Sequence, residues 1–341
     1  MTLRVLVAGL GNMGLSHALA YAHNPDFEIV GLVNRSPVDL PPELAGHEIL
    51  QDYHEALRRL APDLVCIATY SDSHADYAVA ALEAGAHVFV EKPLATTVAD
   101  AQRVAEAAQR TGKKVVVGYI LRHHPSWIRL IEESRALGGP YVFRLNLNQQ
   151  SSGPTWEVHK ALMRTTSPIV DCGVHYVDVM CQITDAPPVE VRGMGLRLSE
   201  EVAPEMYNYG HFQVLFADGS CGWYEAGWGP MMSDTAFFVK DVVSPRGAVS
   251  IRMPDSARSD DIDTHTKTSL IRVHRVGQGD EDLSMEDEPG HQELCDREQA
   301  FVARAIREDL DLSRHLQDAV RSLAVCLAAD ESVRSGQPVR L

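Results

Sequence analysis

The sequence predicts an α/β protein of two domains: a doubly wound parallel sheet, followed by an α+β domain with a large, mostly antiparallel sheet. Up to about residue 120, short apolar runs alternate with helix-like stretches, which is typical of a parallel sheet covered on both faces. Farther along, apolar runs follow one another with few helical stretches between them, which favours antiparallel pairing. A length of 341 residues fits about two domains. We place them at residues 1–122 and 123–341.

Composition excludes several classes of function. The formal net charge of −16 disfavours nucleic acids and anionic membranes as partners, because both attract clusters of Lys and Arg. No apolar run approaches the ~18 residues that span a bilayer, and Val5–Leu10 lacks the basic flank and cleavage site of a signal peptide. The six cysteines are scattered without a Cys-x-x-Cys pair, which favours reduced thiols over disulfides or structural zinc. We therefore expect a cytoplasmic protein.

The first domain is expected to hold six strands with helices between them. Ala75–Glu83 and Val98–Gln109 are the clearest helices, and Gly85 and Gly112 stand where a left-handed C-cap would end them. The expected strands are Arg4–Ala8, Ile29–Val33, Glu48–Leu50, Leu64–Ala68, His87–Val90 and Val115–Val117.

A glycine-rich turn joins the first strand to the first helix. In Gly9-Leu10-Gly11-Asn12-Met13-Gly14, Gly9 permits a sharp turn, Gly11 lets a pyrophosphate approach the backbone, and Gly14 lets the helix pack closely on the strand. Glycine-rich turns also occur for backbone reasons alone. The position between a strand and a helix favours dinucleotide binding here, since the free amides of a helix N-terminus attract phosphate. This arrangement is typical of a Rossmann domain.

The second strand ends at Asn34, where a dinucleotide-binding fold often places an acid that binds the adenosine ribose. Asn34-Arg35-Ser36 contains no acid and would not repel a 2′-phosphate, and the Arg35 guanidinium could pair with that phosphate or stack over it. We therefore favour NADP over NAD. If Arg35 is only a solvated turn residue, this preference has no basis.

Two polar segments follow later strands of the same sheet. The loop from Thr69 to His74 lies at the carboxyl end of the sheet, where open α/β sheets bind ligands, so Thr69 and His74 are candidates to contact ribose or nicotinamide. Ser73 is also a candidate helix N-cap. The fifth strand ends in Glu91-Lys92-Pro93, and a lysine directly after a buried strand is costly unless its ammonium has a partner or a task. Pro93 fixes the backbone and allows a cis bond.

The second domain begins with an expected helix, Trp127–Leu137, that ends at Gly138-Gly139. Ala217–Ser220 is a turn that predicts a hairpin. Asp255–Thr268 and Gly277–Gly290 are expected to be solvated loops. His291–Arg307 and Leu312–Arg334 are expected amphipathic helices without chemistry, and helices over 291–335 could pack back on the first domain. The expected strands are Tyr141–Gln149, Val189–Met194, His211–Phe216, Cys221–Glu225, Ala236–Lys240, Ala248–Met253 and Leu270–Val276.

A second chemical motif lies on a helix that Ser167 would cap, with Pro168 in its first turn. Asp171, His175 and Asp178 are spaced i, i+4 and i+7, so they share one face of that helix, whereas Val174, Val177 and Cys181 share another. A histidine between two carboxylates is a reasonable general base, although ordinary surface ion pairs explain the same pattern. Metal ligation by Cys172, His175 and Cys181 is disfavoured, because nothing else completes a zinc set.

Several of these motifs together resemble one family of oxidoreductases. The glycine turn, Ala68-Thr69, Glu91-Lys92-Pro93, and Gly118-Tyr119 with Arg122 match, in order and spacing, the glucose–fructose oxidoreductase, inositol dehydrogenase and rhizopine-catabolism (Gfo/Idh/MocA) family. Glu-Lys-Pro at this place is the hallmark of that family, and the resemblance covers essentially the whole chain. Asp-x-Gly-x-His-x-x-Asp, here from Asp171 to Asp178, resembles the motif whose aspartate and histidine contact the sugar.

The chain departs from the family pattern in two places. Thr166-Ser167-Pro168 stands where the family often has three glycines, and Tyr70 stands where it often has proline. Both changes alter pocket walls rather than reacting groups. They therefore affect the inference of substrate identity more than the inference of reaction type. Trp156 and His159 lie in an expected loop that could cover a polyol, since tryptophan faces stack on sugars, although a lone tryptophan is as often part of a core.

The resemblance implies an NAD(P)-dependent oxidoreductase that transfers a hydride between nicotinamide and a secondary alcohol or ketone of a sugar, sugar derivative or inositol. Lys92 would hold the reacting oxygen, His175 would accept its proton, and Asp171 would orient the substrate or the histidine; Lys92 as the base is the variant. No metal is expected. The expected substrate-binding residues are Tyr119, Arg122, Trp156, His159 and Asp178. The expected cofactor-binding residues are Gly9, Gly11, Asn12, Met13, Gly14, Asn34, Arg35, Thr69, His74, Glu91 and Lys92.

The resemblance also implies assembly and leaves two other functions open. It implies an open C-terminal sheet on which subunits associate as a homodimer or homotetramer. One alternative function is a glycosidase of the same family that keeps NAD bound and oxidises the sugar transiently. The other is a sensor that binds NAD(P) without catalysis, and the presence of both Lys92 and His175 counts against it.

Overall fold

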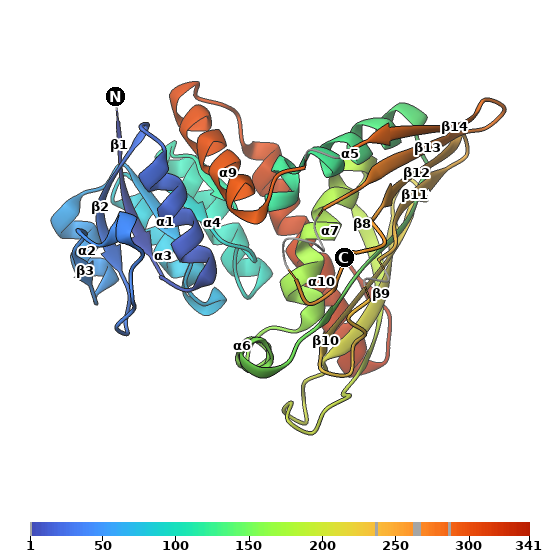
Figure 1. Ribbon diagram of the computed structural model, residues 1–341, viewed down its shortest axis with the longest axis horizontal. Helices are drawn as coiled ribbons and strands as arrows, with labels where there is room; N and C mark the ends of the chain where they lie inside the picture. Colours follow the sequence, from blue (N-terminus) through green and yellow to red (C-terminus); the bar gives the residue numbers. More distant parts are fainter. Residues whose placement is uncertain (1, 236–237, 262–266, 286–287) are drawn as a thin grey trace. The chain divides into compact units, whose positions relative to one another are not determined.

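The computed structural model describes residues 2–235, 238–261, 267–285 and 288–341 (Figure 1). The chain divides into two compact units. Unit 1 comprises Met1–Ile120 and Gln292–Val320, and unit 2 comprises Leu121–His291 and Arg321–Leu341. Each unit contains one sheet, and each contains some of the residues that the sequence singles out.

Unit 1 is built on a six-stranded parallel sheet, counted over the described residues, in the order β3-β2-β1-β4-β5-β6. The strand order reverses between β1 and β4, and the carboxyl ends of such neighbours are where doubly wound sheets bind ligands. This order confirms the predicted fold class and all six expected strands. The strands are β1 Leu3–Ala8, β2 Phe27–Val33, β3 Ile49–Leu50, β4 Leu64–Ile67, β5 His87–Val90 and β6 Val115–Val117; the helices are α1 Asn12–His23, α2 Tyr53–Leu60, α3 His74–Glu83, α4 Val98–Thr111, α9 His291–Arg307 and the first part of α10 Ser313–Ser335.

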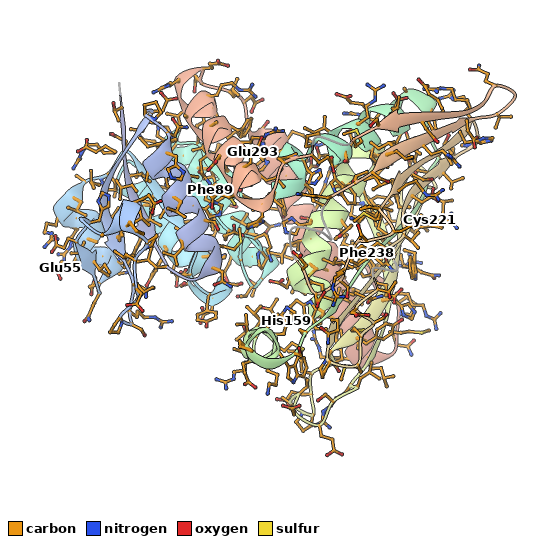
Figure 2. All side chains as sticks on the ribbon, viewed as in Figure 1. Glu55, Phe89, His159, Cys221, Phe238 and Glu293 are labelled. Carbon is orange, nitrogen blue, oxygen red and sulfur yellow. The ribbon has the colours of Figure 1, made fainter. Side chains whose placement is uncertain are left out.

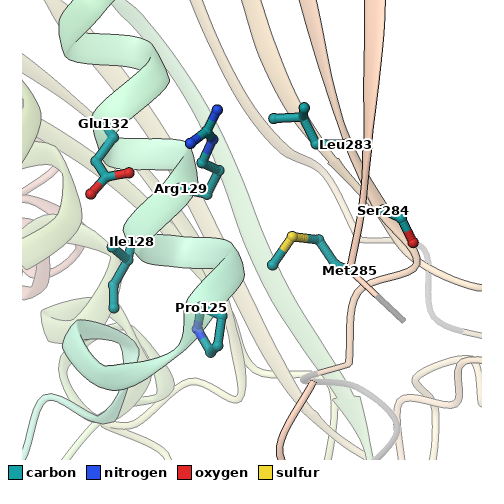
Figure 3. Close-up of a pocket in the computed structure, with 7 residues that line it drawn as sticks. All are labelled: Pro125, Ile128, Arg129, Glu132, Leu283, Ser284 and Met285. Carbon is teal, nitrogen blue, oxygen red and sulfur yellow. The ribbon is translucent and has the colours of Figure 1, made fainter. Parts of the chain in front are cut away.

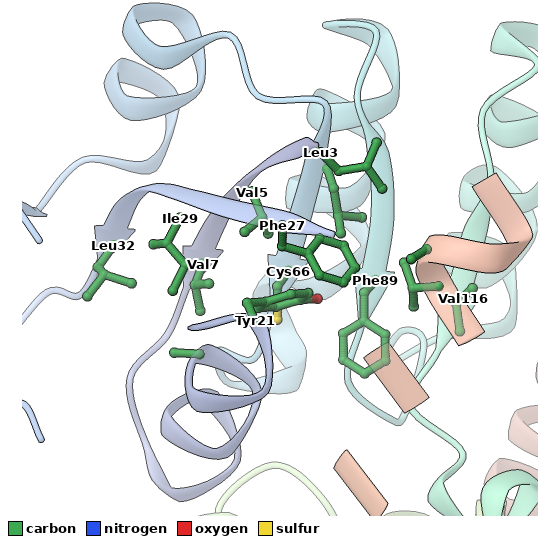
Figure 4. Close-up of a cluster of buried hydrophobic side chains, with 14 of the residues drawn as sticks. Leu3, Val5, Val7, Tyr21, Phe27, Ile29, Leu32, Cys66, Phe89 and Val116 are labelled. Atoms are coloured by element: carbon green, nitrogen blue, oxygen red, sulfur yellow. The ribbon is translucent and has the colours of Figure 1, made fainter. Parts of the chain in front are cut away.

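The core of unit 1 joins its N-terminal sheet to a late segment of the chain. Val5, Tyr21 and Phe89 are at most 1% exposed and belong to one apolar cluster (Figure 4), which also contains Val302 and Leu312 from the C-terminal segment. Full burial of such a side chain stabilises the fold by about 1.5–3 kcal/mol. The segment 292–320 is therefore an integral part of unit 1.

Unit 2 is built on a sheet of nine strands among the described residues, in the order β14-β13-β12-β11-β7-β10-β9-β8-β15. Pairing is antiparallel except between β7 and β10, and β9 and β10 form the predicted hairpin. The strands are β7 Val142–Gln150, β8 Pro188–Leu196, β9 Tyr209–Phe216, β10 Cys221–Gly229, β11 Lys240–Ser244, β12 Gly247–Arg252, β13 Leu270–Arg275, β14 Gly279–Ser284 and β15 Val339–Arg340; the helices are α5 Pro125–Leu137, α6 Gly153–Leu162, α7 Pro168–Thr184 and the rest of α10. The mostly antiparallel second sheet is thus confirmed.

Three expectations for local structure are wrong or incomplete. The segment around Trp156 and His159 is the helix α6 rather than a loop. Part of Gly277–Gly290 is the strand β14 rather than a loop: it pairs antiparallel with β13, and exposed ion pairs such as Arg272–Asp282 lie across the two strands where an apolar pattern was expected. Of the expected strand Ala236–Lys240, the described residues 238 and 239 are not in a strand, and β11 begins at Lys240.

Some expected segments lie partly outside the described residues. These are positions 236–237 of the strand Ala236–Lys240, positions 262–266 of the loop Asp255–Thr268, and positions 286–287 of the segment Gly277–Gly290. Among the helices that the structure describes, none is both long and apolar enough to cross a bilayer.

Candidate active site

The glycine turn after β1 divides into residues that shape the backbone and one that leaves space. Gly9 has φ +91°, and a Cβ there would collide with the backbone of Ala68; a Cβ on Gly14 would collide with the carbonyl of Gly9. A Cβ on Gly11 would meet no atom within 4 Å in the described structure. No acid stands in the first turn of α1, whose residues are all described. This open, uncapped helix N-terminus fits a phosphate group.

Asn34, directly after β2, braces the same turn. Its Oδ1 accepts a hydrogen bond from the Leu10 amide at 3.0 Å, and its Nδ2 donates to the Ser36 carbonyl at 2.8 Å. The side chain of Arg35 is exposed. Asn34 thus uses its amide to fix the glycine turn, and Arg35 is the residue of this pair that can reach a ligand.

The loop after β4 is tied to the Glu-Lys-Pro turn by His74. Its Nδ1 lies 2.8 Å from the Pro93 carbonyl oxygen and its Nε2 lies 3.0 Å from that of Thr69. Burial lowers the pKa of His74, so the ring is neutral and donates to one carbonyl at a time. Ser73 precedes α3 but makes no side-chain cap; its Oγ contacts Thr69 instead. With the His74 ring 1% exposed, these contacts point to a role in holding the loop.

Lys92 follows β5 and is the one residue of the described stretch 88–95 that is not buried. The Lys92–Pro93 bond is cis. Glu91, immediately before it, is 7% exposed, and its carboxylate lies 2.7 Å from His17 Nε2 and accepts the Lys92 amide at 3.1 Å. The sheet and this carboxylate therefore hold the backbone from which the lysine side chain extends.

Gly118 and Tyr119 follow β6; Gly118 lies close to the Glu91 carboxylate, and Tyr119 is buried. A Cβ on Gly118 would come within 3.2 Å of the Glu91 carboxyl carbon, so the glycine leaves room for that carboxylate. Tyr119 is 1% exposed and packs edge-on against the His315 ring, with a centroid distance of 6.1 Å. Tyr119 thus packs inside unit 1.

In unit 2, α7 carries the second motif. Ser167 caps the helix as predicted, since its Oγ accepts the Val170 amide at 3.1 Å, and the same hydroxyl donates to Asp330 at 2.7 Å. Within the described stretch 168–181, Asp171 and His175 are half-exposed and every other residue is buried. This stretch of the helix therefore presents Asp171 and His175, one turn apart, as its reachable polar side chains.

Asp178, the third member of the predicted face, is fully buried. Arg122 donates to both of its oxygens, at 2.9 Å from Nε and 2.6 Å from Nη2, and Gln182 donates at 2.9 Å. A bidentate arginine–carboxylate pair of this kind is strong and geometrically fixed. The structure thus joins Arg122 to Asp178, two residues expected to bind substrate, and separates Asp178 from the exposed pair.

Trp156 and His159 are packed within unit 2. The Trp156 indole is 5% exposed, donates to Glu201 at 3.2 Å and has the Lys160 ammonium 5.7 Å from its ring centroid. His159 (Figure 2) stacks on Trp228 at 4.3 Å between centroids. Both rings are engaged by protein groups of unit 2, and they lie on a helix rather than in the loop that was expected to cover a polyol.

Two further features of the structure concern possible ligand sites. A surface pocket in unit 2, beside α5 and the end of β14, contains none of the predicted site residues; its lining is Pro125, Ile128, Arg129, Glu132, Leu283, Ser284 and Met285 (Figure 3). In the described part of the chain, no group of three or more His, Cys, Asp or Glu side chains could hold a metal ion.

The sequence did not indicate the two residues that support Glu91, which are His17 and Gln299. His17 and Gln299 are fully buried and hydrogen-bonded to each other, although 282 positions separate them in the chain. A histidine three residues after Gly14 was the only available signal, and it gave no indication of its partner.

Comparison with known proteins agrees with this geometry. Residues 3–119 match the family described as "Oxidoreductase family, NAD-binding Rossmann fold", and residues 128–239 match the "GFO/IDH/MocA C-terminal domain". Inositol 2-dehydrogenase of Salmonella typhimurium is 32% identical over 188 residues, 53% of this chain and 54% of that protein, so the match spans about half the length of this relative. The scyllo-inositol 2-dehydrogenase (NAD(+)) of Bacillus subtilis is 25% identical over 354 residues, 99% of this chain and 96% of that protein.

Solved structures share the fold. An oxidoreductase domain protein from Kribbella flavida has a TM-score of 0.83 at 22% identity, covering 100% of this chain and 99% of that one. The scyllo-inositol dehydrogenase of Lactobacillus casei, solved with bound NAD(H) and scyllo-inositol, has a TM-score of 0.78 at 19% identity, covering 100% and 99%. The family matches in both units and the shared fold lead to one conclusion: the chain belongs to the Gfo/Idh/MocA family of oxidoreductases, whose N-terminal domain is an NAD-binding Rossmann fold.

Proposed function

We propose that this protein is an NAD(P)-dependent dehydrogenase that oxidises a secondary alcohol of a sugar, sugar derivative or inositol, or reduces the matching ketone. The observation that supports it most is Lys92: one accessible cation in a buried stretch, at the carboxyl end of a dinucleotide-binding sheet. A lysine so placed can polarise an alcohol or ketone oxygen. Inositol dehydrogenases among the relatives agree with a polyol substrate.

Each part of the site takes one role in this proposal. The amides at the start of α1 hold the pyrophosphate, with Gly11 leaving it room. Bound nicotinamide supplies the hydride chemistry. The Lys92 ammonium holds the reacting oxygen, His175 accepts the proton of the hydroxyl during oxidation and returns it during reduction, and Asp171 orients the substrate or the imidazole. Lys92 as the base, with His175 positioning the substrate, is the variant of this scheme.

NADP remains the favoured cofactor in our proposal. Residues 34–36 contain no acid that would repel a 2′-phosphate, and the amide of Asn34 is already used within the turn. The exposed Arg35 guanidinium is left as the group that could pair with the phosphate.

The outer face of the second sheet is the proposed surface for a homodimer or homotetramer. Val142 on β7, Met194 and Leu196 on β8, and Leu215 on β9 are 42–56% exposed, and exposed apolar groups of this kind mark association surfaces. Sedimentation equilibrium tests this proposal. Leu215→Glu should lower the mass of the assembly, whereas Val276→Glu, at the end of β13, should leave it unchanged.

The deciding experiment measures reduced nicotinamide by absorbance, with NADP+ and NAD+ in parallel against hexoses, glycosides, sugar acids and inositols. Lys92→Met is expected to lower kcat by ~10² or more with little change in nucleotide affinity, and Lys113→Met is the matched control. A substrate-dependent signal that Lys92→Met abolishes supports the dehydrogenase. Turnover of a glycoside without net absorbance change, at one nucleotide per chain, would identify the redox glycosidase. Nucleotide binding without any turnover would identify the sensor.

A further inference from the structure

We propose that His17 and Gln299 are positioning residues for Lys92, and that they act through the carboxylate of Glu91. None of these three side chains is expected to touch the substrate. The inference rests on the proposed role of Lys92 in the reaction, and it concerns how unit 1 holds that lysine in place.

A continuous chain of hydrogen bonds runs beneath Lys92. The Tyr21 hydroxyl donates to Gln299 Oε1 at 2.6 Å, and Gln299 Nε2 lies 3.0 Å from His17 Nδ1. His17 Nε2 lies 2.7 Å from Glu91 Oε1, while Glu91 Oε2 accepts the backbone amide of Lys92 at 3.1 Å. These hydrogen bonds thus connect α1, α9 and the end of β5.

The chemistry of the groups fixes the direction of these bonds. An amide NH2 can only donate, so His17 Nδ1 must accept from Gln299. The proton of the neutral imidazole is then on Nε2, where it faces the Glu91 carboxylate. Gln299 therefore selects the tautomer in which His17 can donate to Glu91.

Water cannot readily replace these hydrogen bonds, because the side chains that make them are buried. His17 and Gln299 are 0% exposed and Tyr21 is 1% exposed, and the His17 ring also packs edge-on against Phe89 at 4.6 Å between centroids. A buried carboxylate needs hydrogen-bond donors to stay ionised. The His17 N–H and the Lys92 amide are donors of this kind for Glu91.

A second carboxyl, Glu298, lies in the same interior. Burial and the neighbouring charge of Glu91 raise the pKa of Glu298 well above its usual range, so Glu298 is the neutral acid of the two. Glu298 is 1% exposed, and its Oε1 has no hydrogen-bond partner among the described residues. The negative charge of this interior therefore rests on Glu91, the carboxyl that His17 contacts.

Loss of the His17 N–H donor should disturb the position of Lys92 in two steps. Glu91 would keep one donor fewer in a buried place, so it would bind a proton or turn away. The Lys92 amide would then lose a well-oriented acceptor, and the lysine side chain would start from a less constrained backbone. A misplacement of about 1 Å can cost ~10² in rate.

The experiment compares His17→Leu, which keeps apolar volume without a donor, with His17→Gln, whose NH2 can occupy the place of Nε2–H. His23→Leu, at the exposed end of the same helix, is the matched control. We expect kcat to fall about tenfold or more in His17→Leu, with nucleotide Kd nearly unchanged, and to recover largely in His17→Gln. Gln299→Met is the second variant if His17→Leu does not fold, and we expect a smaller fall in kcat.

Amide hydrogen exchange gives a readout that needs no substrate. The peptide containing Lys92 should exchange faster in His17→Leu than in wild type, and close to wild type in His17→Gln. In a Glu91→Gln background, His17→Leu should have a much smaller further effect on kcat, since the two residues act in series. Equal exchange and equal kcat in the Leu and Gln variants would overturn the inference, because packing alone would then explain His17. If wild type lacks dehydrogenase activity but the exchange pattern is found, the proposed function fails and the positioning of Lys92 stands.

Discussion

Lys92 in unit 1 and the Asp171–His175 pair in unit 2 are supported in different ways. Lys92 extends from a backbone that a buried chain of hydrogen bonds holds from below. Asp171 and His175 lie on the reachable face of α7, a helix that is otherwise buried and fixed by its cap. The comparison shows two ways in which this fold holds a polar side chain: a buried set of hydrogen bonds supports the backbone of Lys92, whereas the packing and the cap of one helix support Asp171 and His175.

The largest effect is expected from the reachable pair itself. His175→Asn should lower kcat by ~10² or more, because the proposed base is removed. In wild type, the rate of alcohol oxidation should fall on the acidic side, since a protonated imidazole cannot accept a proton, and this dependence should be absent from His175→Asn. Steady-state rates across pH measure both, with His211→Asn as the control. An unchanged pH profile would assign the base to Lys92 instead.

The buried member of the same helix face should act on stability rather than on chemistry. Asp178→Asn leaves the Arg122 guanidinium without its carboxylate, and breaking such a buried pair costs about 3 kcal/mol of unfolding free energy. Asp185→Asn, which removes a half-exposed pair with Arg135, should cost less than about 1 kcal/mol. Urea unfolding of both variants tests the contrast. If Asp178→Asn unfolds like wild type but loses activity, Asp178 belongs to the substrate site after all.

A smaller effect is expected at the adenosine end of unit 1. Arg35→Ala should weaken NADPH binding by about tenfold, equal to about 1.4 kcal/mol, and change NADH binding little, because only the former carries a 2′-phosphate. Titration of intrinsic fluorescence measures both affinities. Arg58→Ala, on α2, is the control. Equal losses for the two nucleotides would remove Arg35 from cofactor selection.

The last expected effect is a pH dependence of stability at Glu298, whose pKa is raised by burial and by Glu91. The folded state then binds its proton more tightly than the unfolded chain does. As pH rises above about 4.3, the unfolded chain releases this proton first, and the free energy of unfolding falls by about 1.4 kcal/mol per pH unit until the raised pKa is passed.

The glutamine of Glu298→Gln cannot titrate. The free energy of unfolding of this variant, relative to that of wild type, should therefore increase as pH rises across that range. Thermal unfolding at several pH values provides the measurement, with Glu293→Gln on the exposed side of α9 (Figure 2) as the control. A difference between Glu298→Gln and wild type that stays constant with pH would show that Glu298 is not the neutral acid of this interior.

The parts of the site that obey local rules could be predicted from the sequence. The glycine turn, the Ser167 cap and the cis bond before Pro93 each depend on residues close in the chain, and the structure has all three. The succession of apolar runs predicted the second sheet, and the family resemblance implied the same.

The remaining features depend on long-range contacts or on weak local signals. Helical spacing placed Asp178 beside His175, but a partner 56 positions away, Arg122, decides what Asp178 does. The edge strand β14 lacks an apolar pattern because nearly all of its side chains are exposed, so its sequence resembles a loop although its backbone pairs with β13. The partnership of His17 with Gln299 joins the two ends of unit 1, and no local pattern records it.

The late position of Gln299 has a consequence for how the protein is made. A ribosome releases the glycine turn, Glu91 and Lys92 long before it reaches α9, and domains tend to fold as units once their residues have emerged. Unit 1 includes residues 292–320, so this unit cannot complete its fold until α9 has emerged from the ribosome. Until then His17 lacks the partner that sets its tautomer, and a chain truncated before residue 291 would lack the hydrogen bonds that support the backbone of Lys92.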